Sequence, residues 1–529
     1  MRASARGTSS SSPSTRSGGA GPWAPTRWSS TRSCTTETCT PGARSPRRTT
    51  NPMSPPSGSP SAPGPGGRSR SENGFPVVAP DGSTGRWHRN LHRFISFAAR
   101  TYYQVTVAGS PVPPRGPVLI VANHPNSLLD AALVSAAADR PVRFLAKAPL
   151  FEKRSIGWAV RGLGALPIYR REDAPELMGR NRATFEAVWN ALVEGSAVGI
   201  FPEGLSHSGP SLAPLKTGSA RIALGSMRLM DEPFPILPVG LTFRGGKERF
   251  RSEALLLIGK PVRWTDLARN VQADEDLGEG AAAVRELTER IHAGLSRVTV
   301  NLERWEDLPV VETAEAVHTA EFGRGHTQNP VRWLARMRRT AVALDEARKR
   351  DASGVSDLAE ELESHARILD GLALDPQDLH TRPRASVAWR WTLMNLGFFG
   401  VAAPLALIGT LIFLLPWRIV GWAEPRFDLP DDRRATYKVL GGIVTLGLWV
   451  LLLAALIFYV WGWRFAVGSL VILPLLGLLT LRIRERWGDA AGDLRRFLVL
   501  KGRNDIRSRL LERQRELAKQ IRSLQAELG

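Results

Sequence analysis

Three long apolar blocks near the C-terminus constrain the fold of this 529-residue chain most strongly. Residues 391–417 and 439–463 contain 27 and 25 residues without a charge, and residues 465–481 contain 17 more after Arg464. About 20 consecutive apolar residues are enough to cross the hydrocarbon core of a bilayer. The region 391–481 is therefore predicted to form two to three membrane segments.

The formal net charge of +20 is compatible with an anionic membrane surface or with nucleic acid as a partner. Nucleic-acid binding does not account for the apolar blocks, and the sequence contains no nucleic-acid recognition motif. Attraction to a membrane surface accounts for both features. Membrane lipid is therefore the predicted partner, and no nucleic acid is expected.

The N-terminal residues 1–80 are predicted to be a disordered, low-complexity tail. Residues 1–75 contain ten Arg, no Lys and two acids among many Ser, Pro, Gly and Thr, which cannot form a packed core. The composition resembles a transit peptide. It is equally compatible with a start assigned too far upstream, for which Met53 is one candidate. Cys34 and Cys39 both lie here, so no disulfide or thiolate metal site is expected in the folded part.

Residues 87–105 show a helical stripe of apolar side chains with Arg and His on the other face. Two interpretations remain open from this pattern. The helix packs on the domain that follows, or it is an amphipathic helix that lies in the membrane interface.

From 112 to 300, short β-branched runs alternate with helical stretches, which predicts an α/β fold with a mostly parallel sheet flanked by helices. A helical region over 301–385 and the membrane segments follow. The basic tail 482–529, with 13 Lys and Arg against 7 acids, is predicted to be an amphipathic helix. Its apolar residues have coiled-coil spacing, which suggests an oligomer formed through 504–528. The expected strands are 117–122, 142–146, 197–201 and 235–243, and the expected helices include 175–193 and 213–230.

His124 and Asp130 lie where the first of these strands turns into a helix. In one interpretation, Ser127 and Asp130 form a capping box and His124 is only a turn residue. In the other, the turn folds the imidazole of His124 over the carboxylate of Asp130. The carboxylate would then fix the tautomer of the ring and leave the second ring nitrogen available as a base.

Further polar residues follow other predicted strands. Arg170 and Arg171 come after a short apolar segment, Glu203 and Gly204 come directly after a strand, and Lys216 lies a few residues further on. Parallel α/β sheets bind ligands at this end of their strands. A base, adjacent guanidinium groups and a glycine that permits close approach suit an acyl acceptor that carries a phosphate.

The blocks NHPNSLLD (123–130), GALPIYR (164–170), FPEGLS (201–206) and ILPVG (236–240) occur in a fixed order. In order and spacing they resemble the four motifs of the glycerolipid (PlsC-type) acyltransferase superfamily, over roughly residues 112–265. The usual first motif has four residues between His and Asp, whereas this chain has five. That spacing is similar to the branch that contains fungal glycerol-3-phosphate and dihydroxyacetone-phosphate acyltransferases.

The resemblance implies a membrane-bound enzyme of phospholipid biosynthesis that transfers a fatty acyl group to a glycerol phosphate or a lysophosphatidate. The donor would be a thioester, either acyl-CoA or acyl carrier protein, and no cofactor or metal is expected. His124 would be the general base and Asp130 would orient it. The residues expected to bind the acceptor and its phosphate are Arg170, Arg171, Glu203, Gly204, Ser206 and Lys216.

Two other functions are compatible with parts of the sequence. Residues 204–208 nearly match the G-x-S-x-G motif of serine hydrolases, with Ser206 as nucleophile, but the last position is Ser208. A non-catalytic membrane scaffold is the second alternative, because the C-terminal 230 residues have no identified chemistry.

The acyl donor is made in the cytoplasm, so the catalytic domain is expected on that side of the membrane. Basic segments prefer the same side. A first block broken at Pro404, followed by a spanning hairpin over 439–463 and 465–481, keeps the domain and the basic tail cytoplasmic. Three spanning segments, which would place the tail on the far side, are the alternative.

Overall fold

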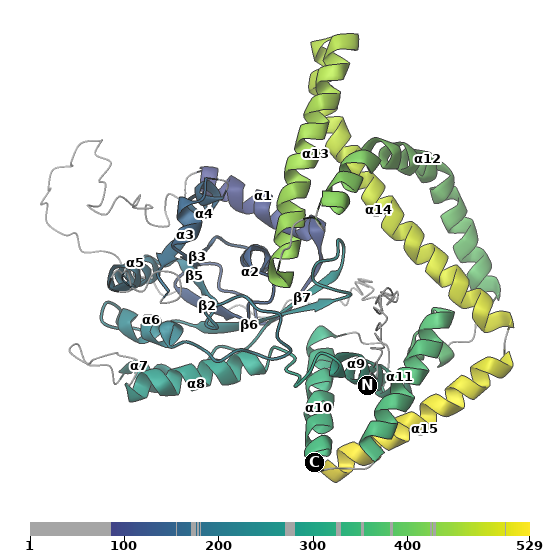
Figure 1. The fold of residues 1–529 in the computed structure, drawn as a ribbon, viewed down its shortest axis with the longest axis horizontal. Coiled ribbons are helices and arrows are strands. Elements are labelled where there is room, and N and C mark those ends of the chain that lie inside the picture. The colour runs from purple at the N-terminus through teal and green to yellow at the C-terminus, as the bar shows by residue number, and fades with distance from the viewer. Residues whose placement is uncertain are drawn as a thin grey trace, which may run out of the picture.

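The computed structural model describes residues 86–528 except 155, 171–175, 177–178, 180, 270–280, 324–328, 351–353, 381–384, 424–425, 427–429 and 503. The predicted tail 1–80, with Cys34 and Cys39, lies outside the described residues, and so does Arg171. The described part contains an α/β domain, a helical bundle beside it, and long apolar helices that project from it (Figure 1).

The α/β domain is built on one sheet with strand order β1-β7-β6-β2-β5-β3-β4 in the described residues. Strands β6 and β7 pair antiparallel, whereas the other neighbours pair parallel. The predicted α/β class with a mostly parallel sheet is thus confirmed. The strands are β1 (Gln104–Gly109), β2 (Val118–Ala122), β3 (Val142–Lys147), β4 (Leu166–Ile168), β5 (Ala197–Ile200), β6 (Ile236–Arg244) and β7 (Glu253–Ile258).

The central strand β2 shows why the sheet forms here. All five of its residues, VLIVA, are buried, as expected for a strand covered by helices on both faces. Alternate side chains point to opposite faces. Val118 and Ile120 pack in the cluster with α2 (Leu128–Ala138), whereas Leu119 and Val121 pack in the cluster with α5 (Asn181–Val193) and α6 (Gly218–Ser226).

The first helix and several elements differ in length from the prediction. Helix α1 is Arg86–Tyr102, and residues 104–109, predicted in part as the end of that helix, form strand β1 instead. Strand β1 pairs with β7 through a parallel ladder between segments far apart in sequence. Pairing between distant segments leaves no pattern in the local sequence, so residues 104–105 were assigned to the preceding helix. The helix predicted at 213–230 is shorter, since α6 spans Gly218–Ser226. Of the helix predicted at 175–193, residues Asn181–Val193 form α5, and most of residues 175–180 lie outside the described residues.

The region after the sheet forms a helical bundle. Helices α8 (Ala282–Ser296), α9 (Asp307–Phe322), α10 (Pro330–Lys349) and α11 (Gly354–Leu372) precede a short 3₁₀ helix, η2 (Pro376–His380). The C-terminal helix α15 (Asn504–Leu528) returns to this bundle and buries Leu517, Ala518 and Ile521 in the core that α9 and α10 share. The apolar face on which the predicted oligomer rested is therefore covered within the chain.

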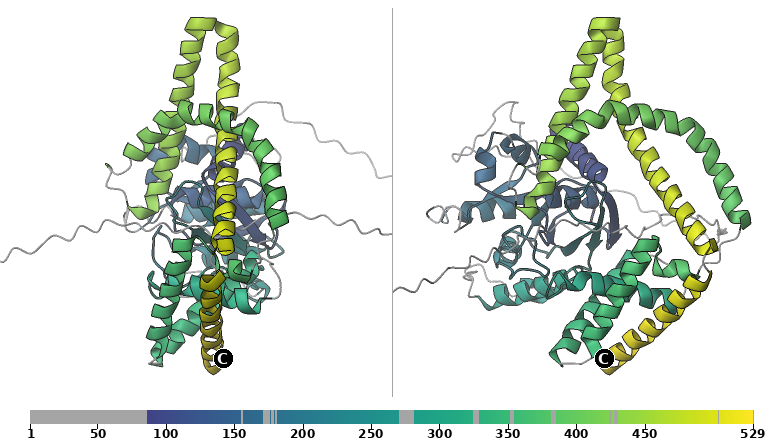
Figure 2. Two further views of the ribbon diagram at one scale, coloured as in Figure 1. Left: turned by 90° about the vertical axis from the view of Figure 1, so that its right-hand side faces the viewer. Right: turned by 45° about the vertical axis from the view of Figure 1, so that its right-hand side comes forward.

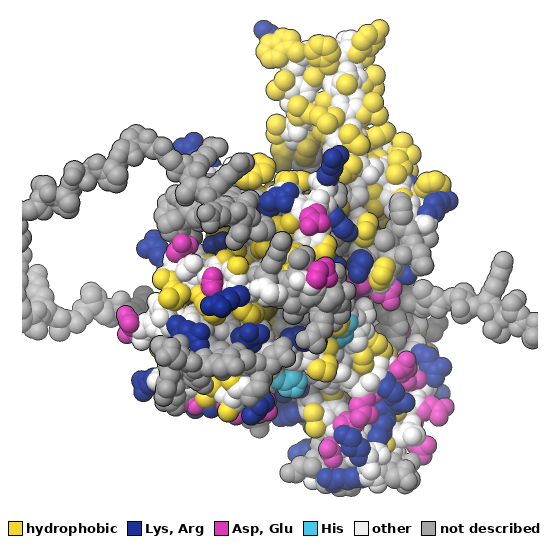
Figure 3. Space-filling view, turned by 60° about the vertical axis from the view of Figure 1, so that its left-hand side comes forward, with side chains coloured by type: hydrophobic (Ala, Val, Ile, Leu, Met, Phe, Trp, Pro, Cys, Tyr) yellow, Lys and Arg dark blue, Asp and Glu magenta, His cyan; other side chains and the backbone are white. Residues whose placement is uncertain are grey.

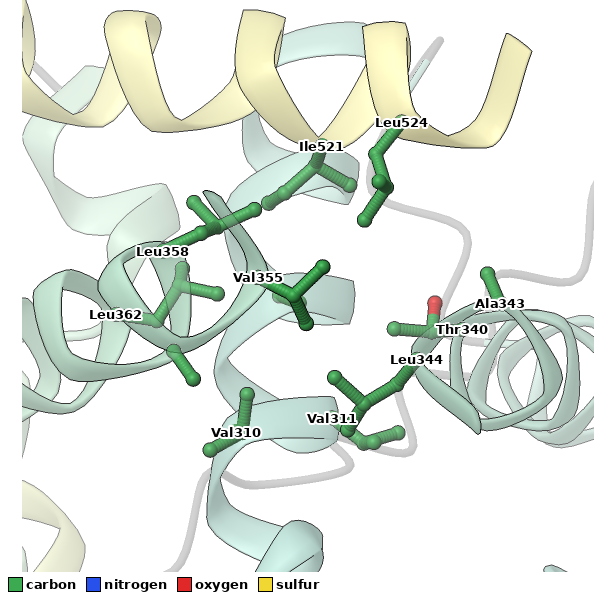
Figure 4. A pocket seen from close by; sticks show the side chains of 12 residues that line it. Val310, Val311, Thr340, Ala343, Leu344, Val355, Leu358, Leu362, Ile521 and Leu524 are labelled. Atoms are coloured by element: carbon green, nitrogen blue, oxygen red, sulfur yellow. The ribbon is translucent and has the colours of Figure 1, made fainter. Parts of the chain in front are cut away.

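The bundle encloses a small apolar cavity of about 40 Å³. Its lining comes from α9, α10, α11 and α15, with Val355, Leu344 and Ile521 pointing inward (Figure 4). Sites for small molecules typically have volumes of about 300–1,000 Å³. The cavity is therefore a packing space of the bundle and not a substrate site.

Three described helices are long and apolar enough to cross a membrane, which fits membrane association. They are α12 (Ala385–Ala423), α13 (Asp431–Trp461) and α14 (Trp463–Gly502). Helices α13 and α14 form a hairpin whose turn is Gly462, at φ +88°. The outer part of this hairpin is covered with exposed apolar side chains and projects beyond the rest of the chain (Figure 3).

Helix α12 bends into an arch, and both of its ends lie on the α/β-domain side of the hairpin tip (Figure 2). Pro404 and Pro416 lie inside it, and proline kinks a helix because it lacks the N–H that bonds the carbonyl four residues earlier. For Pro416 that carbonyl belongs to Ile412. It accepts a hydrogen bond of 2.9 Å from the indole N–H of Trp449 on α13. The kink and the packing of α12 on the hairpin are therefore coupled.

The bases of the hairpin helices contact the α/β domain directly. Ala435 of α13 is completely buried in the same core cluster as residues of α2. On α14, Glu485 is paired with Arg251, which follows strand β6. The hairpin and the α/β domain are thus joined by packing and by an ion pair.

Candidate active site

The site lies at the carboxyl ends of β2 and β5, which are neighbours in the sheet. The loop after β2 carries His124, and the loop after β5 carries Glu203, Gly204 and Ser206. Because parallel neighbours end at the same edge, two loops 79 residues apart in sequence meet there. His124 donates its backbone N–H to one carboxylate oxygen of Glu203, at 2.9 Å.

His124 and Asp130 are in direct contact. The Nδ1 atom of His124 lies 2.9 Å from Oδ2 of Asp130, whose side chain is completely buried on α2. The same oxygen accepts the backbone N–H of Asn126 at 2.6 Å. Ser127, at φ 53°, makes no side-chain cap to the helix. The structure therefore has the loop conformation in which the carboxylate orients the imidazole, and not a capping box.

The ring of His124 is held on a second side by an aromatic stack. Its centroid lies 3.9 Å from that of Phe201, with 9° between the planes. With Nδ1 bonded to Asp130, Nε2 makes no hydrogen bond within the described residues, and the side chain is 18% exposed. A neutral His124 that donates from Nδ1 thus presents an unprotonated Nε2 to an incoming hydroxyl.

Burial raises the pKa of Asp130 above its usual value, because the carboxylate lies away from water. The hydrogen bond and the charge of His124, the backbone N–H of Asn126 and the charge of Lys247 act in the opposite direction. The ionised carboxylate thus depends on these partners. A proton taken up by the imidazole would strengthen its interaction with Asp130, as base catalysis requires.

Glu203 is buried and occupied on both carboxylate oxygens. One oxygen accepts the N–H of His124, and the other contacts Nε2 of His207 and accepts the backbone N–H of Ala213 at 2.8 Å. Glu203 therefore joins the loop after β2 to the loop after β5 through buried hydrogen bonds. A direct contact of Glu203 with the acceptor, which the motif resemblance implied, stays a prediction.

His207 is a second histidine of the site that the sequence reasoning did not single out. Its Nε2 contacts Glu203, and its Nδ1 accepts the backbone N–H of Gly209 at 3.0 Å. Both ring nitrogens are engaged within one loop, so His207 has no nitrogen left to act as a base. The only sequence signal was its position four residues after Glu203.

Ser206, Gly204 and Arg170 form the outer part of the site. The hydroxyl of Ser206 accepts the backbone N–H of Ser127 at 3.0 Å, and no hydrogen bond joins it to a histidine among the described residues. A serine nucleophile needs a base within hydrogen-bonding reach, so this arrangement does not support the hydrolase alternative. Arg170 donates from Nη1 to the carbonyl of Gly204 at 2.8 Å, which places its guanidinium group beside the third motif.

The side chain of Lys216 packs against the backbone of Gly204. Gly204 has φ +74°, and a Cβ atom there would lie 3.2 Å from Cγ of Lys216. The positive φ therefore favours glycine, and a larger residue would also have to displace the Lys216 side chain slightly. Lys216 itself is exposed, with its backbone N–H bonded to Pro202 at 2.7 Å. Among the residues that the structure describes, no cluster of three or more His, Cys, Asp or Glu side chains is arranged to hold a metal ion.

Fold and site together define an α/β domain with a His–Asp pair in the loop after a central parallel strand. Residues 104–242 match the model of the family described as Acyltransferase. The chain is 30% identical to a 1-acyl-sn-glycerol-3-phosphate acyltransferase of Bacillus subtilis over 155 residues, 28% of this chain and 67% of that protein. This chain belongs to the acyltransferase family.

Glycerol-3-phosphate O-acyltransferase 1 of Saccharomyces cerevisiae is 29% identical over 275 residues, which are 49% of this chain and 35% of the yeast protein. The chain thus spans about a third of that relative. A crystal structure of the lysophosphatidate acyltransferase PlsC from Thermotoga maritima aligns with 22% identity and a TM-score of 0.30, over 40% of this chain and 77% of that one. The fold class given above rests on the strand order and not on this alignment.

Proposed function

We propose that this protein is a membrane-bound O-acyltransferase of phospholipid synthesis. It would move a fatty acyl group from a thioester, acyl-CoA or acyl carrier protein, to the hydroxyl of a glycerol phosphate or a lysophosphatidate. The observation that carries the proposal is the contact of 2.9 Å between His124 and the buried Asp130, which leaves Nε2 of His124 without a partner among the described residues.

The reaction needs no covalent enzyme intermediate, because a thioester is already activated. Nε2 of His124 removes the proton of the acceptor hydroxyl while the hydroxyl oxygen attacks the thioester carbonyl. The tetrahedral intermediate collapses to an ester, the carbon–sulfur bond breaks, and the departing thiolate takes the proton from His124. Asp130 keeps Nδ1 protonated at the start and stabilises the imidazolium that forms.

Glycerol 3-phosphate is the acceptor that we propose to test first. The match to the yeast glycerol-3-phosphate enzyme, which covers 49% of this chain, supports this choice. The direct test is transfer of radiolabelled acyl groups by the full chain in membranes. It should be run with glycerol 3-phosphate, lysophosphatidate and other lysolipids, each with acyl-CoA and with acyl carrier protein as donor. Absence of transfer to every acceptor would refute the proposal.

Arg170 is the proposed phosphate clamp, because its guanidinium group lies against the third-motif loop and can bond a phosphate with two parallel N–H groups. We expect Arg170→Ala to raise the acceptor KM about tenfold or more while the donor KM changes little. The exposed Arg182, replaced by alanine, is the matched control and should leave both constants unchanged. Equal increases of both KM values for Arg170→Ala would indicate a role in folding instead.

We further propose that the α/β domain faces the cytoplasm and that α13 and α14 span the membrane as a hairpin, with α12 entering and leaving on one side. The shape of α12 in Figure 2 supports this arrangement, as do the buried base of α13 and the basic segment after residue 481. Exposed Trp87, Phe94 and Phe97 of α1 support contact of this helix with the interface.

Cysteine labelling in intact cells tests this topology. After replacement of Cys34 and Cys39 by serine, single cysteines are placed at Arg464 near the hairpin tip, at exposed Arg433 and at exposed Ser508. Arg433 is chosen because Ala435, two residues further along α13, is buried and would not react. We expect an impermeant maleimide to label position 464 only, and positions 433 and 508 only after permeabilisation. Labelling of position 508 in intact cells would favour three spanning helices.

A further inference from the structure

The turn between β6 and β7 reaches into the active site through Lys247, a residue outside the four motifs. Its ammonium group donates to the backbone carbonyl of Pro125 at 2.6 Å and to the hydroxyl of Ser208 at 2.5 Å. Pro125 directly follows His124, and Ser208 belongs to the loop of the third motif. One side chain thus joins the two loops that form the site, across 122 residues of sequence in the first case.

The backbone of this turn is also fixed on the side of the catalytic loop. The hydroxyl of the buried Tyr103 donates to the carbonyl of Lys247 and accepts the side-chain amide N–H of Asn126 at 2.6 Å. Asn126 in turn donates its backbone N–H to Asp130. The lysine therefore belongs to a continuous polar network that ends at the His124–Asp130 pair.

Charged residues near the N-terminal end of α13 lie close to the same turn. Lys438 of α13 donates to the carbonyl of Glu248 at 3.3 Å. Burial lowers the pKa of Lys247, and the negative charges of Asp130, Asp431, Asp432 and Glu248 raise it. These acids come from α2, from α13 and from the turn itself.

We propose that Lys247 is a positioning residue for acyl transfer, which ties the loop of His124 to the third-motif loop and places a positive charge beside the His124–Asp130 pair. This inference rests on the proposed function. Hydrogen bonds from Nζ fix the carbonyl adjacent to His124, and a displacement of about 1 Å in a catalytic group can lower the rate about a hundredfold.

The positive charge of Lys247 should affect the pH dependence of the rate, whereas a purely structural role would not. A cation beside the pair disfavours an additional proton on it, and His124 must be unprotonated to act as a base. Removal of the cation makes protonation easier, so the acid limb of the pH–rate profile should move to higher pH. Arginine at position 247 retains the charge and should restore the limb, even where its different shape lowers kcat.

The test uses the full chain in membranes with glycerol 3-phosphate and acyl-CoA, or whichever acceptor and donor the panel identifies. We expect Lys247→Met to reduce kcat roughly tenfold to a hundredfold with little change in acceptor KM. We also expect it to move the acid limb to higher pH. Lys247→Gln, which keeps a hydrogen-bond donor without charge, should move the limb equally and is the second variant if Lys247→Met does not fold. Lys260→Met, at an exposed position just after β7, is the matched control.

The possible outcomes separate the two proposals. An unmoved limb in both neutral variants, or a limb that Lys247→Arg fails to restore, would overturn the role of Lys247. Loss of thermal stability with a normal pH profile would also overturn it, because that result indicates only a structural tie. Activity that survives His124→Ala contradicts the proposed function itself, whatever the Lys247 variants do.

Discussion

Replacement of His124 by alanine should reduce kcat by about 10²–10⁴, the range typical for removal of a general base. Neither of the two nearby titratable side chains of the third-motif loop can take over. Both ring nitrogens of His207 are engaged, and Glu203 is buried with both oxygens occupied. The acceptor and donor KM values should change little, because Nε2 of His124 acts on the reacting hydroxyl and does not carry the binding.

The measurement is the initial rate of acyl transfer over a range of acceptor concentrations, with protein amounts matched by immunoblot. His292→Ala removes an exposed histidine of α8 and is the matched control, which should retain normal activity. A His124→Ala enzyme with kcat near that of the unmodified protein would show that the base lies elsewhere.

Asp130→Asn should lower kcat by as much as about 10⁴, close to the effect of losing the base itself. An asparagine amide can donate to Nδ1 of His124, and the ring proton then moves to Nε2, where a hydroxyl can no longer be deprotonated. The double variant of both residues should be hardly worse than either single variant, because the two act as a unit.

The same substitution should not destabilise the fold. Burial raises the pKa of Asp130, so the ionised carboxylate is less favourable in the folded than in the unfolded state at neutral pH. This cost is fully present above the folded-state pKa, decreases as the pH falls below that pKa, and is absent below the unfolded-state pKa. Asparagine removes it at every pH. An amide nitrogen that faces Nδ1 of His124 cannot accept the backbone N–H of Asn126, and this loss offsets part of the gain. The expected result is a lost activity with a thermal midpoint close to that of the unmodified protein. A much lower midpoint together with lost activity would mean that Asp130 is chiefly structural.

Local patterns in the sequence were sufficient for several parts of this protein. Strand β2 is a continuous apolar run, and such a run requires cover on both faces wherever it lies. The apolar blocks that became α13 and the first half of α14 are long enough to span a bilayer by composition alone. Residues 123–130 alone left a capping box and a His–Asp pair open, and the ordered set of four motifs favoured His124 and Asp130 as partners.

Only the tertiary structure decided what the remaining polar groups do. Glu203 meets the backbone of His124 because β2 and β5 are sheet neighbours, and Lys247 reaches Pro125 because β6 lies on the other side of β2. From the sequence, the apolar face of α15 was predicted to contact another chain, whereas in the structure it packs against α9 and α10. Each of these contacts joins segments whose proximity depends on strand order and packing. The periodicity of a sequence describes the environment of a residue, but it does not specify which distant segment supplies that environment.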